Sequence, residues 1–200
     1  IWALRGAGDF SLGDAKMIYY LGGVDGWIMP NSNQIADANN NVTGYRYFDP
    51  NNTPATDQNY VYQSLAINMR GFKQNVANGN NAIVINSELR LPVFSTFIDK
   101  PINSAFVRNF QLVQFIDLGT AWAGDFKNIK RPTYIYSGNP LSNPVVFRIK
   151  AGGIGPFVGG YGFGARSTLL GYFMKLDAGW PMIGVFRGKP IWYFSIGLDF

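Results

Sequence analysis

The sequence predicts an all-β fold, and more specifically a transmembrane antiparallel β-barrel. Apolar residues recur at every second position in six segments, which is the signature of strands with one apolar face. These segments run for about 10 residues or more, whereas strands of soluble sheets average about 5–6. A tilted strand that crosses a bilayer needs about 9–11 residues. Charged residues make up only 14% of the chain, against roughly 25% in soluble domains.

The clearest alternation lies in the last segment, residues 191–200. One face of this predicted strand is continuously apolar, and the other carries mostly small or polar residues. The apolar face consists of Trp192, Phe194, Ile196, Leu198 and Phe200.

Five further segments repeat this pattern: 2–10, 81–93, 107–122, 157–169 and 173–182. Their polar faces carry Gly, Ser, Asn and a few charges of both signs, which suits the lumen of a barrel. A soluble sandwich or lipocalin-like barrel is the alternative, but its outer face would carry many Lys and Glu. Aromatic residues near the strand ends favour a membrane-interface girdle: Trp2, Tyr19, Tyr20, Trp122, Tyr172, Trp180, Trp192 and Tyr193.

The connections differ in length. Residues 11–80 and 123–146 form two long links, while 95–105, 170–171 and 183–190 are shorter. Placing both long links outside gives an up-down order for all six strands, as in outer-membrane barrels. The first link is rich in Asn and is expected to be a solvated loop. Its Asp37, Asp49 and Asp57 do not have the spacing of an EF-hand calcium loop.

Six strands cannot close a membrane barrel, for which about eight is the practical minimum. We therefore expect further strands from an N-terminal portion outside this sequence, from another polypeptide or from copies of this chain. No run of about 18 apolar residues is present, so no transmembrane helix is expected. The opening residues lack the basic region of a signal peptide, which indicates a processed or excerpted piece of a longer protein, or else a cytoplasmic chain.

The absence of Cys and His narrows the chemistry. Catalysis by a Ser-His or Cys-His pair is excluded, and so is a Cys/His zinc site. We expect no enzyme activity, no cofactor and no metal. The formal charge is +5, but the basic residues are scattered, apart from Lys127, Lys130 and Arg131. We therefore expect no nucleic-acid partner.

An ordered series of short motifs resembles the C-terminal barrel region of the BamA-type outer-membrane assembly and translocation superfamily, which includes BamA, TamA and the two-partner secretion transporters. The resemblance covers residues 1–200. It implies the last six strands of a sixteen-stranded barrel, with the N-terminal barrel half and any periplasmic domains outside this chain. The motifs occupy residues 19–23, 69–72, 79–82, 87–92, 115–122, 162–166 and 176–181.

In that superfamily, an Arg-Gly-Phe motif lies on an external loop that folds back into the lumen, where its Arg meets acids of the wall. The resemblance implies this role for Arg70, Gly71 and Phe72, with Glu88 and Asp117 as the acids. The alternation places both acids on the polar face independently. The alternative is a set of unrelated loop and lumen charges. The stretch 25–67 departs from the family pattern and indicates an added external surface on the 11–80 loop.

The terminal strand is similar to an outer-membrane β-signal, which assembly machinery reads by strand addition at a sheet edge. The resemblance also implies a seam between this strand and the first strand of the barrel; an ordinary closing strand is the alternative. The glycines at 160, 162 and 164 do not open a helix. In a strand, glycine marks curvature or the close approach of another backbone more often than a nucleotide loop.

For function, the resemblance implies protein-insertion or translocation machinery in the bacterial outer membrane. The partners would be outer-membrane lipid, the remaining barrel strands, and client or complex-partner proteins. The alternative is a specialised barrel of the same fold that anchors or scaffolds a larger outer-membrane complex. An outer-membrane protease or phospholipase is disfavoured because the usual general base, His, is missing.

Overall fold

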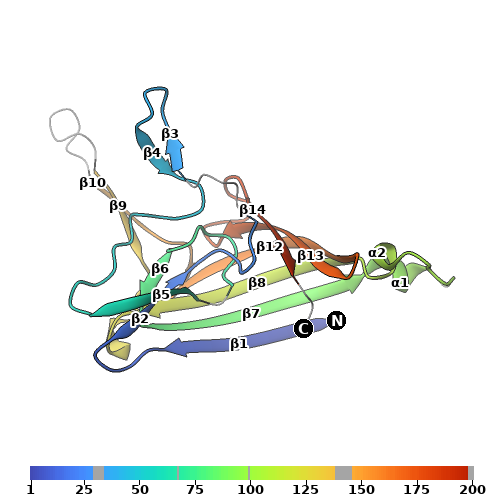
Figure 1. Ribbon diagram of the computed structural model, residues 1–200, viewed down its shortest axis with the longest axis horizontal. Coiled ribbons are helices and arrows are strands. Elements are labelled where there is room, and N and C mark those ends of the chain that lie inside the picture. The colour runs from blue at the N-terminus through green and yellow to red at the C-terminus, as the bar shows by residue number, and fades with distance from the viewer. Residues whose placement is uncertain (29–33, 67, 99, 138–145, 198–200) are drawn as a thin grey trace.

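A curved antiparallel sheet dominates the computed structural model, which describes residues 1–28, 34–66, 68–98, 100–137 and 146–197. Its main strands follow one another in chain order, each paired with the next (Figure 1). They are β1 (Trp2–Phe10), β7 (Asn81–Pro92), β8 (Gln111–Trp122), β12 (Phe157–Leu169), β13 (Tyr172–Pro181) and β14 (Ile191–Gly197), with the short β11 (Gly153–Ile154) beside β12. Within the described ranges the sheet does not close on itself, so β1 and β14 are its outer strands.

All six predicted strands are therefore confirmed, and so is their up-down order. The link between β7 and β8 differs from the prediction. Pro92 ends β7, and Val93 begins the short helix α1 (Val93–Phe97) instead of extending the strand. Since proline has no backbone N–H to donate to a ladder, a strand commonly stops there. The predicted strand from Val107 starts only at Gln111, because Ser104 caps a second short helix, α2 (Ala105–Arg108).

The turn between β12 and β13 is the tight connection that the sequence predicts. Leu170 and Gly171 have φ angles of 53° and 84°. Two consecutive positive φ values are the mark of a two-residue hairpin turn that matches the twist of the flanking strands. No helix in the described ranges is long and apolar enough to cross a membrane.

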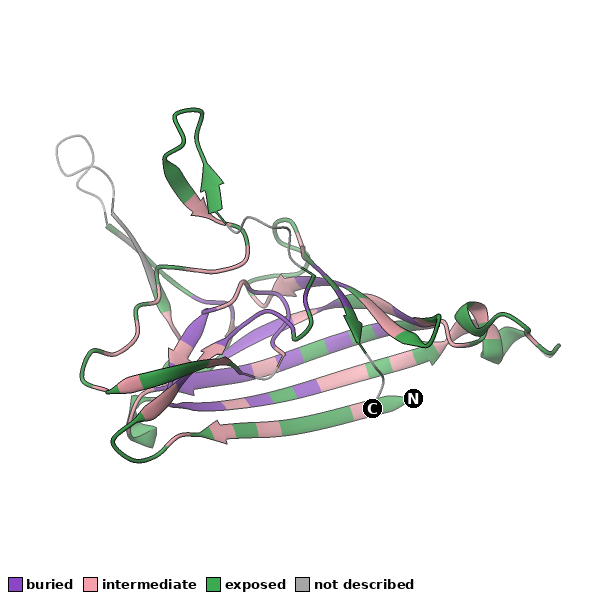
Figure 2. Cartoon of the chain, in the orientation of Figure 1, coloured by how far each residue is buried: buried purple, intermediate pink, exposed green. Residues whose placement is uncertain are grey.

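The apolar face of the sheet is exposed and the polar face is largely buried, as the alternating colours along the strands of Figure 2 show. In β14, Trp192 is 60% exposed and its neighbour Tyr193 is 1% exposed. In β7, Leu89 is 55% exposed while Asn86 is buried. Water-soluble sheets have the reverse arrangement, with apolar side chains in the core.

Only some of the eight aromatic residues that the sequence assigned to a girdle at the strand ends are exposed on the main sheet. Tyr193 is buried because it lies on the polar face, and Trp122 is buried because Phe10 and Phe126 pack around its ring. Tyr19 and Tyr20 lie in the first long link, outside the main sheet. Trp2, Tyr172 and Trp192 are the exposed members.

The first long link is more than a solvated loop, which corrects that expectation. It contains β2 (Lys16–Leu21), β3 (Gln34–Ala36), β4 (Val42–Tyr45), β5 (Tyr60–Leu65) and β6 (Ala77–Gly79). Strands β5, β2 and β6 form a small sheet in which β2 and β5 run parallel, while β3 and β4 form a separate hairpin. The second long link holds the short helix η1 (Phe126–Asn128) and the strand pair β9 (Thr133–Ser137) and β10 (Val146–Lys150).

The main apolar core lies between the first long link and the inner face of the sheet. Apolar residues from both sides meet there, and their burial explains why this part of the link is ordered. The core consists of Leu21, Ala66, Met69, Phe72, Val76 and Ala77 from the link, with Ala82, Val84, Ala121, Ala151 and Val158 from the remainder of the chain.

Candidate functional site

The Arg-Gly-Phe segment follows β5 and precedes β6 in the sequence. It lies against the inner face of the main sheet. Its position is fixed by pairing within the link. Met69 forms an antiparallel bridge with Gly23, and its backbone N–H donates to the carbonyl of Gly23 at 3.0 Å. The two motifs that flank the 25–67 stretch therefore hold each other, although that stretch separates them in sequence.

Arg70 meets Asp117 of β8 with three hydrogen bonds. Its Nε donates to Asp117 Oδ2 at 2.7 Å and its Nη2 to Oδ1 at 2.8 Å, while its backbone N–H also donates to Oδ2 at 3.0 Å. The two guanidinium bonds form the bidentate fork in which arginine and carboxylate geometries match. Asn86 of β7 also donates to Asp117 Oδ1 at 2.9 Å.

The third guanidinium nitrogen, Nη1, reaches two further acids. It donates to Glu88 Oε1 of β7 at 2.6 Å and lies 3.4 Å from Asp177 Oδ2 of β13. Arg70 thus joins the loop to three strands of the wall through one side chain.

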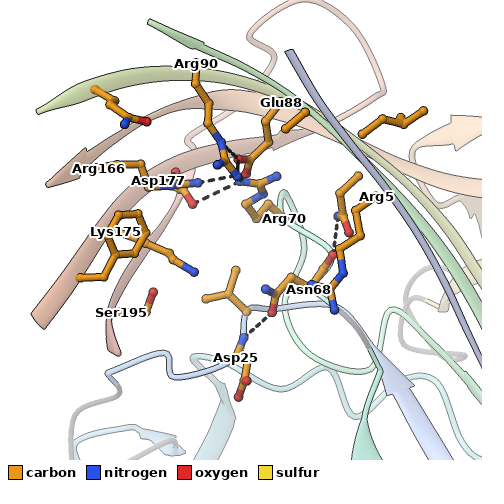
Figure 3. A pocket seen from close by; sticks show the side chains of 16 residues that line it. Arg5, Asp25, Asn68, Arg70, Glu88, Arg90, Arg166, Lys175, Asp177 and Ser195 are labelled. Atoms are coloured by element: carbon orange, nitrogen blue, oxygen red, sulfur yellow. Dashed lines mark hydrogen bonds and ion pairs between the residues drawn. The ribbon is translucent and has the colours of Figure 1, made fainter. Parts of the chain in front are cut away.

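Two more arginines complete a charge-balanced network. Arg166 of β12 donates to Asp177 Oδ1 at 2.5 Å and to Glu88 Oε1 at 3.1 Å. Arg90 of β7 donates to Glu88 Oε2 at 2.9 Å. We call this set the arginine cluster: Arg70, Arg90, Arg166, Glu88, Asp117 and Asp177. Figure 3 shows its members other than Asp117.

The Arg70 side chain is buried against the wall of the sheet. Arg70 is 4% exposed, Asp117 is fully buried, and the guanidinium carbon lies 3.7 Å from the centre of the Phe115 ring. Burial by itself lowers the pKa of Arg70, but the hydrogen bonds and negative charge of Asp117, with Asp177 and Glu88, outweigh it and raise the pKa above its ordinary value. The loop arginine therefore stays charged at any pH that the fold survives.

Glycines allow the loop backbone to approach the wall closely. A Cβ at Gly160 of β12 would lie 1.8 Å from the carbonyl oxygen of Arg70, and one at Gly179 of β13 would lie 2.6 Å from the backbone nitrogen of Gly71. Gly71 itself has a φ of 95°, which favours glycine. Of the sequence-based interpretations of the strand glycines, close backbone approach is confirmed at Gly160.

Tyr193 of β14 secures the next part of the loop. Its hydroxyl accepts the N–H of Gly71 at 3.0 Å and donates to the carbonyl of Phe72 at 2.7 Å. The ring is 1% exposed. Two backbone groups that face a buried wall are thereby satisfied, as buried polar groups must be.

The structure thus brings together Arg70, Glu88 and Asp117, the three residues that the resemblance placed in contact. Gly71 and Phe72 lie beside them. Asp177, Arg166 and Tyr193 belong to the same site, although the sequence assigned no role to the first two and placed Tyr193 in the aromatic girdle. All three lie on the polar faces of their strands, and a position on that face does not identify the partner of a side chain.

The described apolar residues that the sequence assigned to the terminal strand and seam do not face the arginine cluster. Trp192, Phe194 and Ile196 are on the exposed face of β14. Leu198 and Phe200 lie outside the described residues.

A polar cavity of about 290 Å³ adjoins the cluster. Side chains from several strands and from the loop surround it in Figure 3, among them Arg5, Asp25, Asn68, Lys175 and Ser195. Among the described residues, no group of three or more acidic side chains is arranged to hold a metal ion. Every carboxylate of the cluster accepts hydrogen bonds from arginine, so this arrangement is suited to holding a segment in place.

No protein-family model matches this chain, and neither a curated protein nor a solved structure gives a significant match.

Proposed function

We propose that this chain forms part of a transmembrane β-barrel in the bacterial outer membrane, in which the arginine cluster fastens an external loop inside the lumen. The six main strands would be the last six of a sixteen-stranded barrel. The other strands would come from an N-terminal part of the same polypeptide, from another chain or from copies of this one. The barrel would serve to insert or translocate other polypeptides, and it would need no cofactor.

The observation that carries the proposal is the orientation of the sheet. Large apolar side chains are exposed on one face of all six main strands, including Leu4, Leu89, Ile116, Phe163, Leu176 and Trp192. The opposite face holds the buried ions. Exposed apolar patches on soluble monomers rarely exceed a few hundred Å². An apolar band outside and a polar interior are the expected arrangement in a membrane barrel.

The arginine cluster supports a role for the loop inside such a barrel. Three arginines and three acids come from four strands and one loop. A charge inside a barrel wall needs a partner, because burial of an unpaired ion costs several kcal/mol. A loop that supplies the central arginine is consequently fixed in one register, where it narrows the interior at a defined depth.

The outer edge of β14, which pairs with no other strand of the main sheet in the described ranges, supports insertion or translocation as the activity. A strand edge presents unpaired N–H and C=O groups that another strand can complete by β-augmentation. Such groups cannot remain unsatisfied in lipid. A seam at this edge would allow a client strand to pair there while it enters the membrane, without covalent chemistry.

The membrane assignment is testable with neighbouring residues of β1 that have opposite faces. These 200 residues contain no Cys. Single Leu4→Cys and Arg5→Cys variants, made in a full-length protein from which any other Cys has been removed, can therefore carry a spin label in reconstituted bilayers. Leu4 is 64% exposed on the apolar face, whereas Arg5 is on the polar face, where it pairs with Asn86 of β7. We expect lipid-dissolved oxygen to relax the label at 4 and a water-soluble nickel chelate to relax the label at 5. Equal access of the chelate to both labels would contradict the proposal.

The loop role is testable by Arg70→Ala at matched expression level. We expect slower barrel assembly and reduced insertion of a client outer-membrane protein into vesicles that contain the variant. If assembly and insertion both match the wild type, the loop does not need its arginine and this part of the proposal is wrong.

A scaffold or anchor role is the second candidate, and the β3–β4 hairpin favours it. The hairpin projects away from the main sheet in Figure 1, and Ile35 and Val42 on it are exposed. Depletion of the protein separates the two functions. A general loss of outer-membrane proteins supports insertion, whereas loss of one complex with other barrels intact supports the scaffold.

A further inference from the structure

The outer edge of β14 is partly covered by a segment of the first long link. Ser195 pairs with Lys175 of β13 on one side and forms an antiparallel bridge with Trp27 on the other. The N–H of Ile28 donates to the carbonyl of Phe194 at 2.8 Å. These contacts have the pattern of an added strand, because successive residues of a strand direct their backbone groups to opposite edges.

The segment is held by aromatic packing as well as by backbone hydrogen bonds. The Trp27 ring centre lies 4.7 Å from that of Tyr193 and 4.6 Å from that of Tyr47. Trp27, Val24 and Tyr193 form a small buried apolar cluster of their own, separate from the main core. Trp27 is 8% exposed, so a short segment carries a large, well-packed anchor.

The same tyrosine connects this contact to the loop. Tyr193 packs on Trp27 with its ring and holds Gly71 and Phe72 with its hydroxyl. A movement of Trp27 away from β14 would remove packing from the residue that secures the Arg-Gly-Phe segment. The edge of the sheet and the loop inside it are thus in direct physical contact.

From this geometry we propose that Gly26–Ile28, which we call the edge cap, is an intramolecular strand that occupies the β14 edge until an extended polypeptide strand displaces it. The partner is an extended client strand, which needs the same carbonyl of Phe194 that the edge cap uses. Pairing of the strand that closes the barrel is the other outcome of the test. The inference rests on the proposed function and adds its regulation: the edge cap controls access to the seam.

An engineered disulfide tests the edge cap directly. A Cβ at Gly26 would lie 3.8 Å from the Cβ of Ser195, and disulfides join Cβ atoms about 3.5–4.5 Å apart. The double variant Gly26→Cys, Ser195→Cys in the otherwise cysteine-free chain should therefore form a bridge on oxidation. Gly26 has a φ of 65°, so the single Gly26→Cys variant reports any cost of the substitution itself, and the single Ser195→Cys variant is the second control.

The readout is capture of a synthetic peptide with the sequence of residues 191–200, an amphipathic strand, by the full-length protein in bilayers. A photoreactive phenylalanine analogue at position 194 records what pairs at the edge. Crosslinks to the peptide add its mass, whereas crosslinks to a barrel-closing strand of the same polypeptide do not. We expect oxidation of the double variant to reduce peptide capture at least about tenfold, because a covalent bridge removes the open state, and reduction to restore it.

Trp27→Ala provides the opposite perturbation. Loss of the ring should open the edge cap, so peptide capture should rise several-fold and the Ile28 amide should exchange its hydrogen faster. Trp2→Ala is the matched control, since Trp2 is 70% exposed and lies on β1. If the disulfide forms and peptide capture is unchanged, or if Trp27→Ala changes neither readout, the proposed role of the edge cap is wrong. The proposed seam at β14 would be unaffected by that result. If no variant captures the peptide in either redox state, the proposed insertion function fails and its regulation fails with it.

Discussion

Two parts of the first long link are both rich in Asn, but only one of them packs against the main sheet. The docked part, residues 68–79, packs into the sheet, whereas the β3–β4 hairpin projects from it with exposed residues (Figure 2). In the docked part, Met69 and Val76 are buried and the Arg70 side chain is surrounded by acids. The docked part is thus distinguished by buried apolar residues and by an arginine that contacts acids of the wall.

The asparagines themselves show the same contrast. In and beside the docked part, the Asn52 amide donates to the carbonyls of Asn75 and Val76, and the Asn75 amide donates to the carbonyls of Asp49 and Asn52. In the hairpin, Asn39 and Asn41 serve a local turn around Asp37. One residue type thus satisfies buried backbone in one place and shapes a solvated turn in the other.

Arg70→Ala should have the largest effect on the difference between the docked part and the hairpin, because it should release the docked part from the sheet. It leaves Asp117 and Asp177 buried without their central cation, so we expect a loss of about 3–5 kcal/mol in the free energy of unfolding. Urea unfolding of the full-length protein in lipid vesicles measures it, and the docked part should become accessible to protease. Arg70→Lys keeps the charge but not the bidentate geometry, so its free energy of unfolding should lie between those of the wild type and the alanine variant. An alanine variant as stable as the wild type would show that the cluster does not fix the loop.

Gly160→Ala tests the close approach of the loop to the wall. The added Cβ would lie 1.8 Å from the carbonyl of Arg70, so the docked part must shift, and we expect a loss at the upper end of roughly 1–3 kcal/mol. Gly6→Ala is the control, because its Cβ meets nothing within 4 Å. The same urea experiment applies, and equal effects of the two variants would contradict the contact.

Tyr193→Phe removes the hydroxyl that serves Gly71 and Phe72 and leaves the ring in place. We expect a loss of about 1 kcal/mol for each of the two hydrogen bonds. Faster hydrogen exchange at the Gly71 amide should accompany the loss. Tyr172→Phe is the matched control on an exposed residue of β13, and it should change neither quantity.

Asp37→Ala is expected to have the smallest effect, with no change in the urea midpoint of the protein. Hydrogen bonds from Asn41 hold the pKa of the Asp37 carboxyl below its ordinary value of 3.8. Its local contribution is therefore complete above about pH 3.8 and is lost as the pH falls through the lower folded pKa. The chemical shifts of Asn39 and Asn41 during an acid titration measure the loss of these local hydrogen bonds. A large shift of the global midpoint would show that the hairpin is coupled to the sheet.

The sequence predicted which face of its strand each acid of the site occupies. Glu88, Asp117 and Asp177 all stand at polar-face positions of strands that alternation predicts, and Arg70 was assigned its acids through a family resemblance. Tyr193 was misplaced at the membrane interface, because an aromatic residue near a strand end fits that position as well as it fits a buried wall. The link sheet of β5, β2 and β6 was not predicted, since its strands are short and two of them pair in parallel across many residues.

The sequence by itself determined where the six main strands run and which face of each is apolar, because a two-residue period is a local property of the chain. The tertiary structure decided which polar groups meet. Arg70 contacts Asp177 across 107 positions, and Tyr193 contacts Gly71 across 122. Contacts at such separations depend on the curvature of the sheet and on the path of the loop inside it, and no local pattern records either.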